Sequence, residues 1–97
     1  MSQSKNEQLN QLRSKVISEG VASVTTNFIE SAQGAVLRDV DGREYIDFAG
    51  GIAVMNIGHS HPKVVAAIKN QLDSMAFCTR RYTNIAAIEL AEKLAAI

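Results

Sequence analysis

The sequence has no tryptophan, one proline and one cysteine, and its ten basic and ten acidic side chains leave no net charge. A single thiol, Cys78, cannot form an internal disulfide, which excludes a disulfide-stapled secreted scaffold. Interspersed charges of both signs offer no basic surface for a nucleic acid. No apolar run approaches the roughly 20 residues of a membrane span, and no secretory signal opens the chain. We expect a cytoplasmic protein that binds neither nucleic acid nor membrane.

The sequence is short and has the composition of an ordinary globular protein. Its 97 residues are 46% hydrophobic and 21% charged, which favours packing over disorder. This length allows one domain at most and excludes a complete large enzyme. The last apolar stripe stops at Ile97 without a glycine, a proline or a polar tail, so we expect the chain to be the front part of a longer protein.

The first helix is predicted over 5–19. Ser4 and Glu7 have the spacing of a capping box, and an apolar stripe follows them. Gly20 stands where a left-handed residue would end the helix. Two more helices are predicted further on. Pro62 suits a first helical position and opens an apolar stripe over 62–75, and Asn84 is a suitable cap for the last helix.

Between these helices a β-hairpin is predicted. The segments 35–40 and 43–48 flank Asp41-Gly42, a dipeptide typical of a two-residue type I′ turn. That register places Leu37, Ile46 and Phe48 on one face, which we expect to be buried. It also sets Asp39 opposite Glu44, an unfavourable pair of like charges that the pattern leaves unexplained.

In two further stretches the hydrophobic residues do not recur at helical or strand spacing. Residues 21–29 are rich in β-branched side chains and indicate an extended segment. Residues 50–59 are an apolar run bracketed by glycines, which indicates a loop that stays inside. The elements together predict a small α+β unit.

The local chemistry identifies no activity by itself. His59 and His61 lack the further ligands that a metal needs, so we interpret His59 as a hydrogen-bonding residue that pins the glycine loop. Cys78 has no base to activate it as a nucleophile. Arg80 and Arg81 are an isolated doublet, for which solvation and the binding of an anion both remain open.

Two neighbouring runs nevertheless resemble a known family. DGREYIDFAGGIAV at 41–54 and NIGHSHPKVV at 56–65 closely resemble the N-terminal part of class III pyridoxal-phosphate aminotransferases. Within that class the sequence is most similar to members that act on 4-aminobutyrate. The resemblance extends from about Gly34 to Leu94.

The resemblance implies a transamination in two halves. 4-Aminobutyrate gives its amine to pyridoxal 5′-phosphate and leaves succinate semialdehyde, and 2-oxoglutarate takes the amine to become glutamate. In the family the cofactor lysine and the other cofactor contacts lie downstream of residue 97. We therefore expect no catalytic, cofactor-binding or metal-binding residue in this segment, which alone would be inactive.

The resemblance also implies a fold type I transferase with a large α/β domain and a smaller α+β domain, which works as a dimer or tetramer. Residues 1–58 would belong to the small domain, with an N-terminal arm helix and the hairpin. Residues 59–97 would lead into the large cofactor-binding domain.

Three positions are carried over as substrate-binding candidates. Ile52 matches a family residue that lines the substrate pocket. Arg80 and Arg81 fall in a loop that reaches the active site, where the family usually has a polar or apolar pair, and one arginine could hold a substrate carboxylate.

Two alternatives remain. The donor could instead be ornithine, acetylornithine, β-alanine or a diamine, because enzymes for these amines share the fold and the cofactor. The chain could also be a non-catalytic interaction module that docks on a full-length subunit through its first helix.

Overall fold

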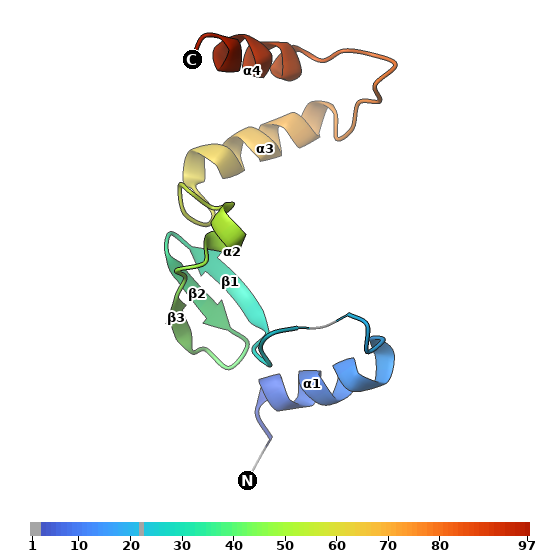
Figure 1. Cartoon of the computed structure of the whole chain (residues 1–97), viewed down its shortest axis with the longest axis vertical. Coiled ribbons are helices and arrows are strands. Elements are labelled where there is room, and N and C mark those ends of the chain that lie inside the picture. The colour runs from blue at the N-terminus through green and yellow to red at the C-terminus, as the bar shows by residue number, and fades with distance from the viewer. Residues whose placement is uncertain (1–2, 22) are drawn as a thin grey trace. The chain divides into compact units, whose positions relative to one another are not determined.

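A computed structural model describes residues 3–21 and 23–97 and confirms the α+β class. The elements follow the order α1 (Lys5–Val16), β1 (Ile29–Gln33), β2 (Val36–Asp39), β3 (Glu44–Ile46), α2 (Gly50–Ala53), α3 (Pro62–Ser74) and α4 (Ile85–Ala95), as labelled in Figure 1. The chain divides into two compact units, Met1–Pro62 and Lys63–Ile97. Each unit is described by itself.

Helix α1 begins as predicted and ends earlier. The Ser4 hydroxyl accepts a hydrogen bond from the Glu7 amide at 3.2 Å, and the Ser4 amide donates to the Glu7 carboxylate at 2.8 Å, which completes the capping box. The helix stops at Val16 rather than near Gly20, because Ile17 already has extended dihedral angles. Two adjacent β-branched residues, Val16 and Ile17, disfavour another helical turn.

The sheet has three antiparallel strands in the order β1-β2-β3, with β2 in the middle (Figure 1). Gln33 pairs with Val36, so Gly34 and Ala35 form a two-residue turn, which was not predicted. Gly34 has a φ of 56°, a conformation that glycine adopts without a steric penalty.

The extended segment predicted over 21–29 includes residue 22, which lies outside the described residues, and β1 begins only at Ile29.

The β2–β3 hairpin corrects the predicted turn and its register. Leu37 pairs with Tyr45 and Arg38 with Glu44, one residue away from the predicted pairing. The loop therefore has three residues rather than two, with the Gly42 amide donating to the Asp39 carbonyl at 2.9 Å. Gly42 alone of the loop has a positive φ, 83°, which fits a type I turn followed by a left-handed residue instead of the type I′ turn.

The shift of one residue overturns the predicted buried face, because neighbouring residues of a strand point to opposite sides. Leu37 and Ile46 lie on opposite faces, and Ile46 and Phe48 are exposed. The like-charge pair also disappears. Glu44 instead faces Arg38, and the two side chains form an exposed ion pair at 2.5 Å.

Asp39 is fully buried, and it joins α1 to the hairpin. Its carboxylate accepts hydrogen bonds from the Asn6 side chain at 3.0 Å, the Tyr45 hydroxyl at 2.9 Å, and the amides of Asp41 and Arg43 at 3.0 and 2.9 Å. Burial alone raises the pKa of this carboxyl, but these hydrogen bonds outweigh burial and leave its pKa below the ordinary value. The buried charge is therefore fully partnered.

The two later helices agree with the predictions. Helix α3 starts at Pro62 and ends one residue before the predicted end. Helix α4 follows Asn84, whose side chain accepts from the Ala87 amide at 2.9 Å. No helix within residues 3–21 and 23–97 is long and apolar enough to cross a membrane.

Apolar burial is sparse throughout the part of the chain that the structure describes, where no hydrophobic side chain is buried. The prediction of an interior loop at 50–59 is wrong for this segment, since Ile52, Val54 and Ile57 are 90%, 71% and 63% exposed. The sheet and its turns are ordered mainly by hydrogen bonds, and large apolar side chains are left available for other contacts.

Candidate functional site

The loop after β3 is closed at its base by Asp47 and His59. The His59 Nε2 atom lies 2.6 Å from Asp47 Oδ2, and both side chains are largely buried. The other oxygen, Asp47 Oδ1, accepts from the amides of Ala49 and Gly50 at 3.0 and 2.9 Å. His59 therefore pins the glycine loop, as predicted, and the structure identifies Asp47 as its partner.

This pairing fixes the charge on Asp47. The hydrogen bond from His59, followed by the one from the Gly50 amide, lowers the pKa of the Asp47 carboxyl. An ionised carboxylate only accepts hydrogen bonds, so the His59 Nε2–H is the donor.

Both ends of the loop are also bound to the β1–β2 turn. Gly34 and His59 exchange two backbone hydrogen bonds, at 2.9 and 2.8 Å, and the Asp47 amide donates to the Ala35 carbonyl at 2.8 Å. Gly58 passes close to this turn with a φ of 84°. A β-carbon there would lie 3.1 Å from the Gly34 α-carbon, so only glycine fits without displacement of the backbone.

Between these fixed ends, the chain forms a left-handed turn. Gly50, Gly51, Ile52 and Ala53 have consecutive φ values of 53°, 66°, 61° and 61°. A left-handed conformation costs about 1–2 kcal/mol for each residue other than glycine, so Ile52 and Ala53 are strained. Strain of this kind persists only where the surroundings impose it, and it concentrates at functional sites. The turn presents Ile52 with 90% of its surface exposed.

Arg80 and Arg81 belong to the second unit, where both are exposed. They occupy a turn in which the Tyr82 amide donates to the Thr79 carbonyl at 3.0 Å and the Arg81 amide donates to the Thr79 hydroxyl at 3.1 Å. The turn borders a hollow of about 840 Å³ between the end of α3 and the start of α4. Thr79 and Tyr82 line this hollow and the two arginines do not.

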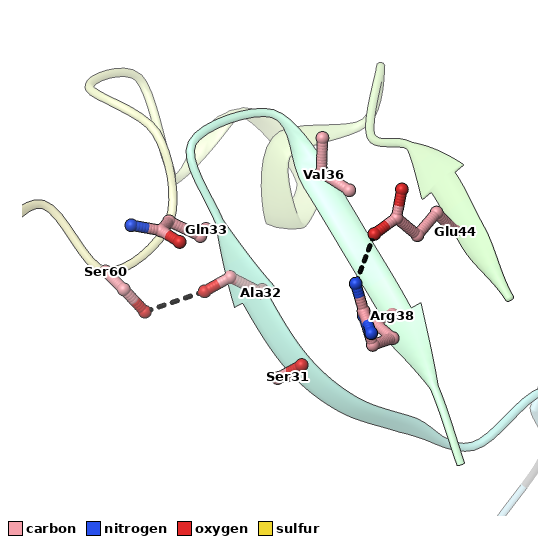
Figure 2. A pocket seen from close by; sticks show the side chains of 7 residues that line it. All are labelled: Ser31, Ala32, Gln33, Val36, Arg38, Glu44 and Ser60. Atoms are coloured by element: carbon pink, nitrogen blue, oxygen red, sulfur yellow. Dashed lines mark hydrogen bonds and ion pairs between the residues drawn. The ribbon is translucent and has the colours of Figure 1, made fainter. Parts of the chain in front are cut away.

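A second hollow, of about 540 Å³, lies over one face of the sheet (Figure 2). It is lined by Ser31, Ala32, Gln33, Val36, Arg38, Glu44 and Ser60. Figure 2 shows the Arg38–Glu44 ion pair within it and the Ser60 hydroxyl donating to the Ala32 carbonyl, at 2.8 Å. Arg38 and Glu44, the charged residues that line this hollow, form an ion pair with each other. The hollow therefore offers a ligand no unpaired charge.

The lysines of this segment lie apart from both hollows. The five lysines, Lys5, Lys15, Lys63, Lys69 and Lys93, are exposed, and none lines either hollow. The described residues also contain no cluster of three potential metal ligands.

Known proteins identify the family. A model of the aminotransferase class III family matches residues 16–97. The 5-aminovalerate aminotransferase DavT of Pseudomonas aeruginosa is 45% identical over 93% of this chain and 21% of its own length. The 4-aminobutyrate aminotransferase GabT of Escherichia coli is 51% identical over 73% of this chain and 17% of its own length.

The fold agrees with this assignment. The taurine:2-oxoglutarate aminotransferase of Bifidobacterium kashiwanohense, solved with pyridoxal phosphate and glutamate, superposes on the whole chain and on 22% of its own, with a TM-score of 0.81 and 28% identity. The chain spans about a fifth of the length of the curated relatives that it matches. It belongs to the class III aminotransferases, a family of fold type I transferases whose cofactor is pyridoxal phosphate.

Proposed function

We propose that this chain is a segment of an ω-amino acid aminotransferase that moves the amine of 4-aminobutyrate to 2-oxoglutarate, with succinate semialdehyde and glutamate as products. The observation that carries the proposal is the fixed left-handed turn, which presents the apolar Ile52 side chain almost fully exposed. An aliphatic surface at this position suits the methylene chain of such a donor. The names of the two relatives, both aminotransferases of short ω-amino acids, support this class of donor.

The chemistry requires polypeptide beyond this segment. Pyridoxal phosphate, when bound, supplies the carbonyl that takes the amine and the ring that accepts the electrons. We propose that its lysine lies elsewhere in the enzyme, since every lysine described here is exposed. The segment then contributes substrate contacts and no catalytic residue. Residues 1–58 would belong to the small domain, and residues 59–97 would lead into the large one.

The assembly and the compartment follow as parts of the proposal. The family resemblance supports a homodimer or tetramer, for which the exposed stripes of α3 and α4 supply apolar surface. The free thiol of Cys78, the only cysteine in this sequence, is compatible with the reducing cytoplasm.

Kinetics of the holoenzyme that contains this segment test the donor. We expect the ratio kcat/KM to be highest for 4-aminobutyrate or 5-aminovalerate, with 2-oxoglutarate as acceptor, and at least about tenfold lower for acetylornithine, ornithine, β-alanine, taurine and diamines. A preference for one of these other amines would reassign the donor. A protein that shows no visible absorbance of bound pyridoxal phosphate and no transamination would instead favour the interaction module.

We further propose that either Arg80 or Arg81 binds the donor carboxylate. Each arginine is exposed on a short, hydrogen-bonded turn, from which a guanidinium can make a bidentate contact. Arg80→Val and Arg81→Val are compared in the holoenzyme, and we expect one of them to lower kcat/KM for 4-aminobutyrate by about 10–100-fold. A diamine is the control substrate, because it has no carboxylate to lose. If both variants preserve the ratio of kcat/KM between the amino acid and the diamine, neither arginine has this role.

A further inference from the structure

The base of the loop that carries Ile52 is built from two side chains with no role in the proposed chemistry. Asp47 and His59 are largely buried, and their side chains together make three hydrogen bonds inside this segment. A pair that is shielded and hydrogen-bonded to the backbone of its own loop in this way is suited to holding a conformation.

The contacts of Asp47 act on the start of the left-handed turn. One carboxylate oxygen accepts hydrogen bonds from the amides of Ala49 and Gly50, and Gly50 is two residues before Ile52. The other oxygen receives His59 Nε2, and the His59 backbone is itself bonded in both directions to Gly34. The sheet, His59, Asp47 and the turn therefore form one continuous chain of contacts that ends two residues from Ile52.

We propose that Asp47 and His59 are a positioning pair that sets the depth to which Ile52 enters the substrate pocket, and so selects the length of the amino acid donor. This inference rests on the proposed function. Because the residues of the turn adopt a left-handed conformation that side chains disfavour, loss of the pair would let the turn relax and move Ile52.

The test compares two substitutions of one residue in the holoenzyme. His59→Leu removes the donor to Asp47, whereas His59→Gln keeps an N–H that can donate to the same oxygen. The readout is the ratio of kcat/KM for 4-aminobutyrate to that for 5-aminovalerate, two donors that differ by one methylene group. We expect His59→Leu to change this ratio by about tenfold, the usual value of one methylene in an apolar pocket, and His59→Gln to keep it within about threefold.

The same comparison in an Ile52→Ala background establishes whether the pair acts through Ile52. If it does, His59→Leu no longer changes the ratio there, as expected of two coupled residues. If His59→Leu fails to fold, Asp47→Ala tests the same pair. We expect it to change the ratio of kcat/KM for 4-aminobutyrate to that for 5-aminovalerate by the same factor of about ten.

Three results would overturn the inference. An unchanged ratio, with kcat/KM lowered equally for both donors, would reduce the pair to a purely structural role. A changed ratio that persists in the Ile52→Ala background would show that the effect does not pass through Ile52. A wild-type holoenzyme that uses neither donor would remove the proposed function and the positioning role together, whereas an active enzyme with an unchanged ratio would remove the positioning role alone.

Discussion

Gly58→Ala is expected to lower the free energy of unfolding by about 3 kcal/mol in the holoenzyme that contains this segment, because two penalties combine. Gly58 has a φ of 84°, and a β-carbon there would meet the Gly34 α-carbon at 3.1 Å, its oxygen at 3.2 Å and its carbonyl carbon at 3.3 Å. Gly34 cannot move away freely, since its amide and its carbonyl are both bonded to His59.

Substitutions of two other glycines distinguish the cost of the left-handed backbone from the cost of the close contact with Gly34. Gly42 has almost the same φ, 83°, but nothing lies within 4 Å of its added β-carbon, so Gly42→Ala should cost only about 1–2 kcal/mol. Gly20 has open space and no positive φ, and Gly20→Ala should change stability by less than about 0.5 kcal/mol. Denaturant midpoints of the three variants measure this order. A Gly58→Ala variant no less stable than Gly42→Ala would contradict the close approach of the loop to the β1–β2 turn.

Local sequence signals predicted α1, α3 and α4 well, because the determinants of these helices lie within a few residues. They did not predict the short α2, which falls in the segment expected to be a loop. The capping box of Ser4 and Glu7, the proline at 62 and the cap at Asn84 each act on neighbouring backbone groups. The end of α1 was less predictable. Gly20 is a common stop signal, but the extended conformation of Ile17 ends the helix earlier.

The hairpin register could not be predicted from its turn dipeptide, because Asp-Gly fits both a two-residue and a three-residue loop. The deciding contacts come from residues outside the turn. Asp39 is buried at the loop by hydrogen bonds that include the Asn6 side chain, 33 residues away in the sequence. In the same network, the amides of Lys5 and Asn6 donate to the Asp41 carboxylate at 2.7 and 3.1 Å. Such long-range polar contacts leave no trace in the periodicity of hydrophobic residues along the sequence.

The candidate site was predictable in part. The glycines predicted the loop, and the position of His59 beside it predicted that this residue pins the loop. The substrate-binding role of Ile52 comes from the family resemblance and stays a prediction. Asp47 lies within the predicted strand at 43–48, and no local signal identifies it as the partner of His59. The run of left-handed residues was also missed, since Ile52 and Ala53 carry side chains that normally avoid this conformation.

The proposed donor binding requires that Ile52 is part of a substrate chamber, which other parts of the enzyme complete. Its exposure of 90% in this segment leaves room for a ligand to cover it. If it lines the chamber, a bound donor should shield this position from a reagent in solution. At a donor concentration ten times Kd, the unoccupied fraction of sites falls about elevenfold.

The most direct test is therefore thiol labelling of Ile52→Cys in a holoenzyme whose native cysteines, Cys78 included, are replaced by serine. Val24→Cys is the control, because Val24 is fully exposed and has no place in the proposed site. The labelling rate is measured with and without 4-aminobutyrate, 2-oxoglutarate and their products at equilibrium, so that the sites stay occupied. We predict a rate about tenfold lower at position 52 with the substrates present and an unchanged rate at position 24. Equal labelling of position 52 with and without substrates, in an active enzyme, would contradict the account.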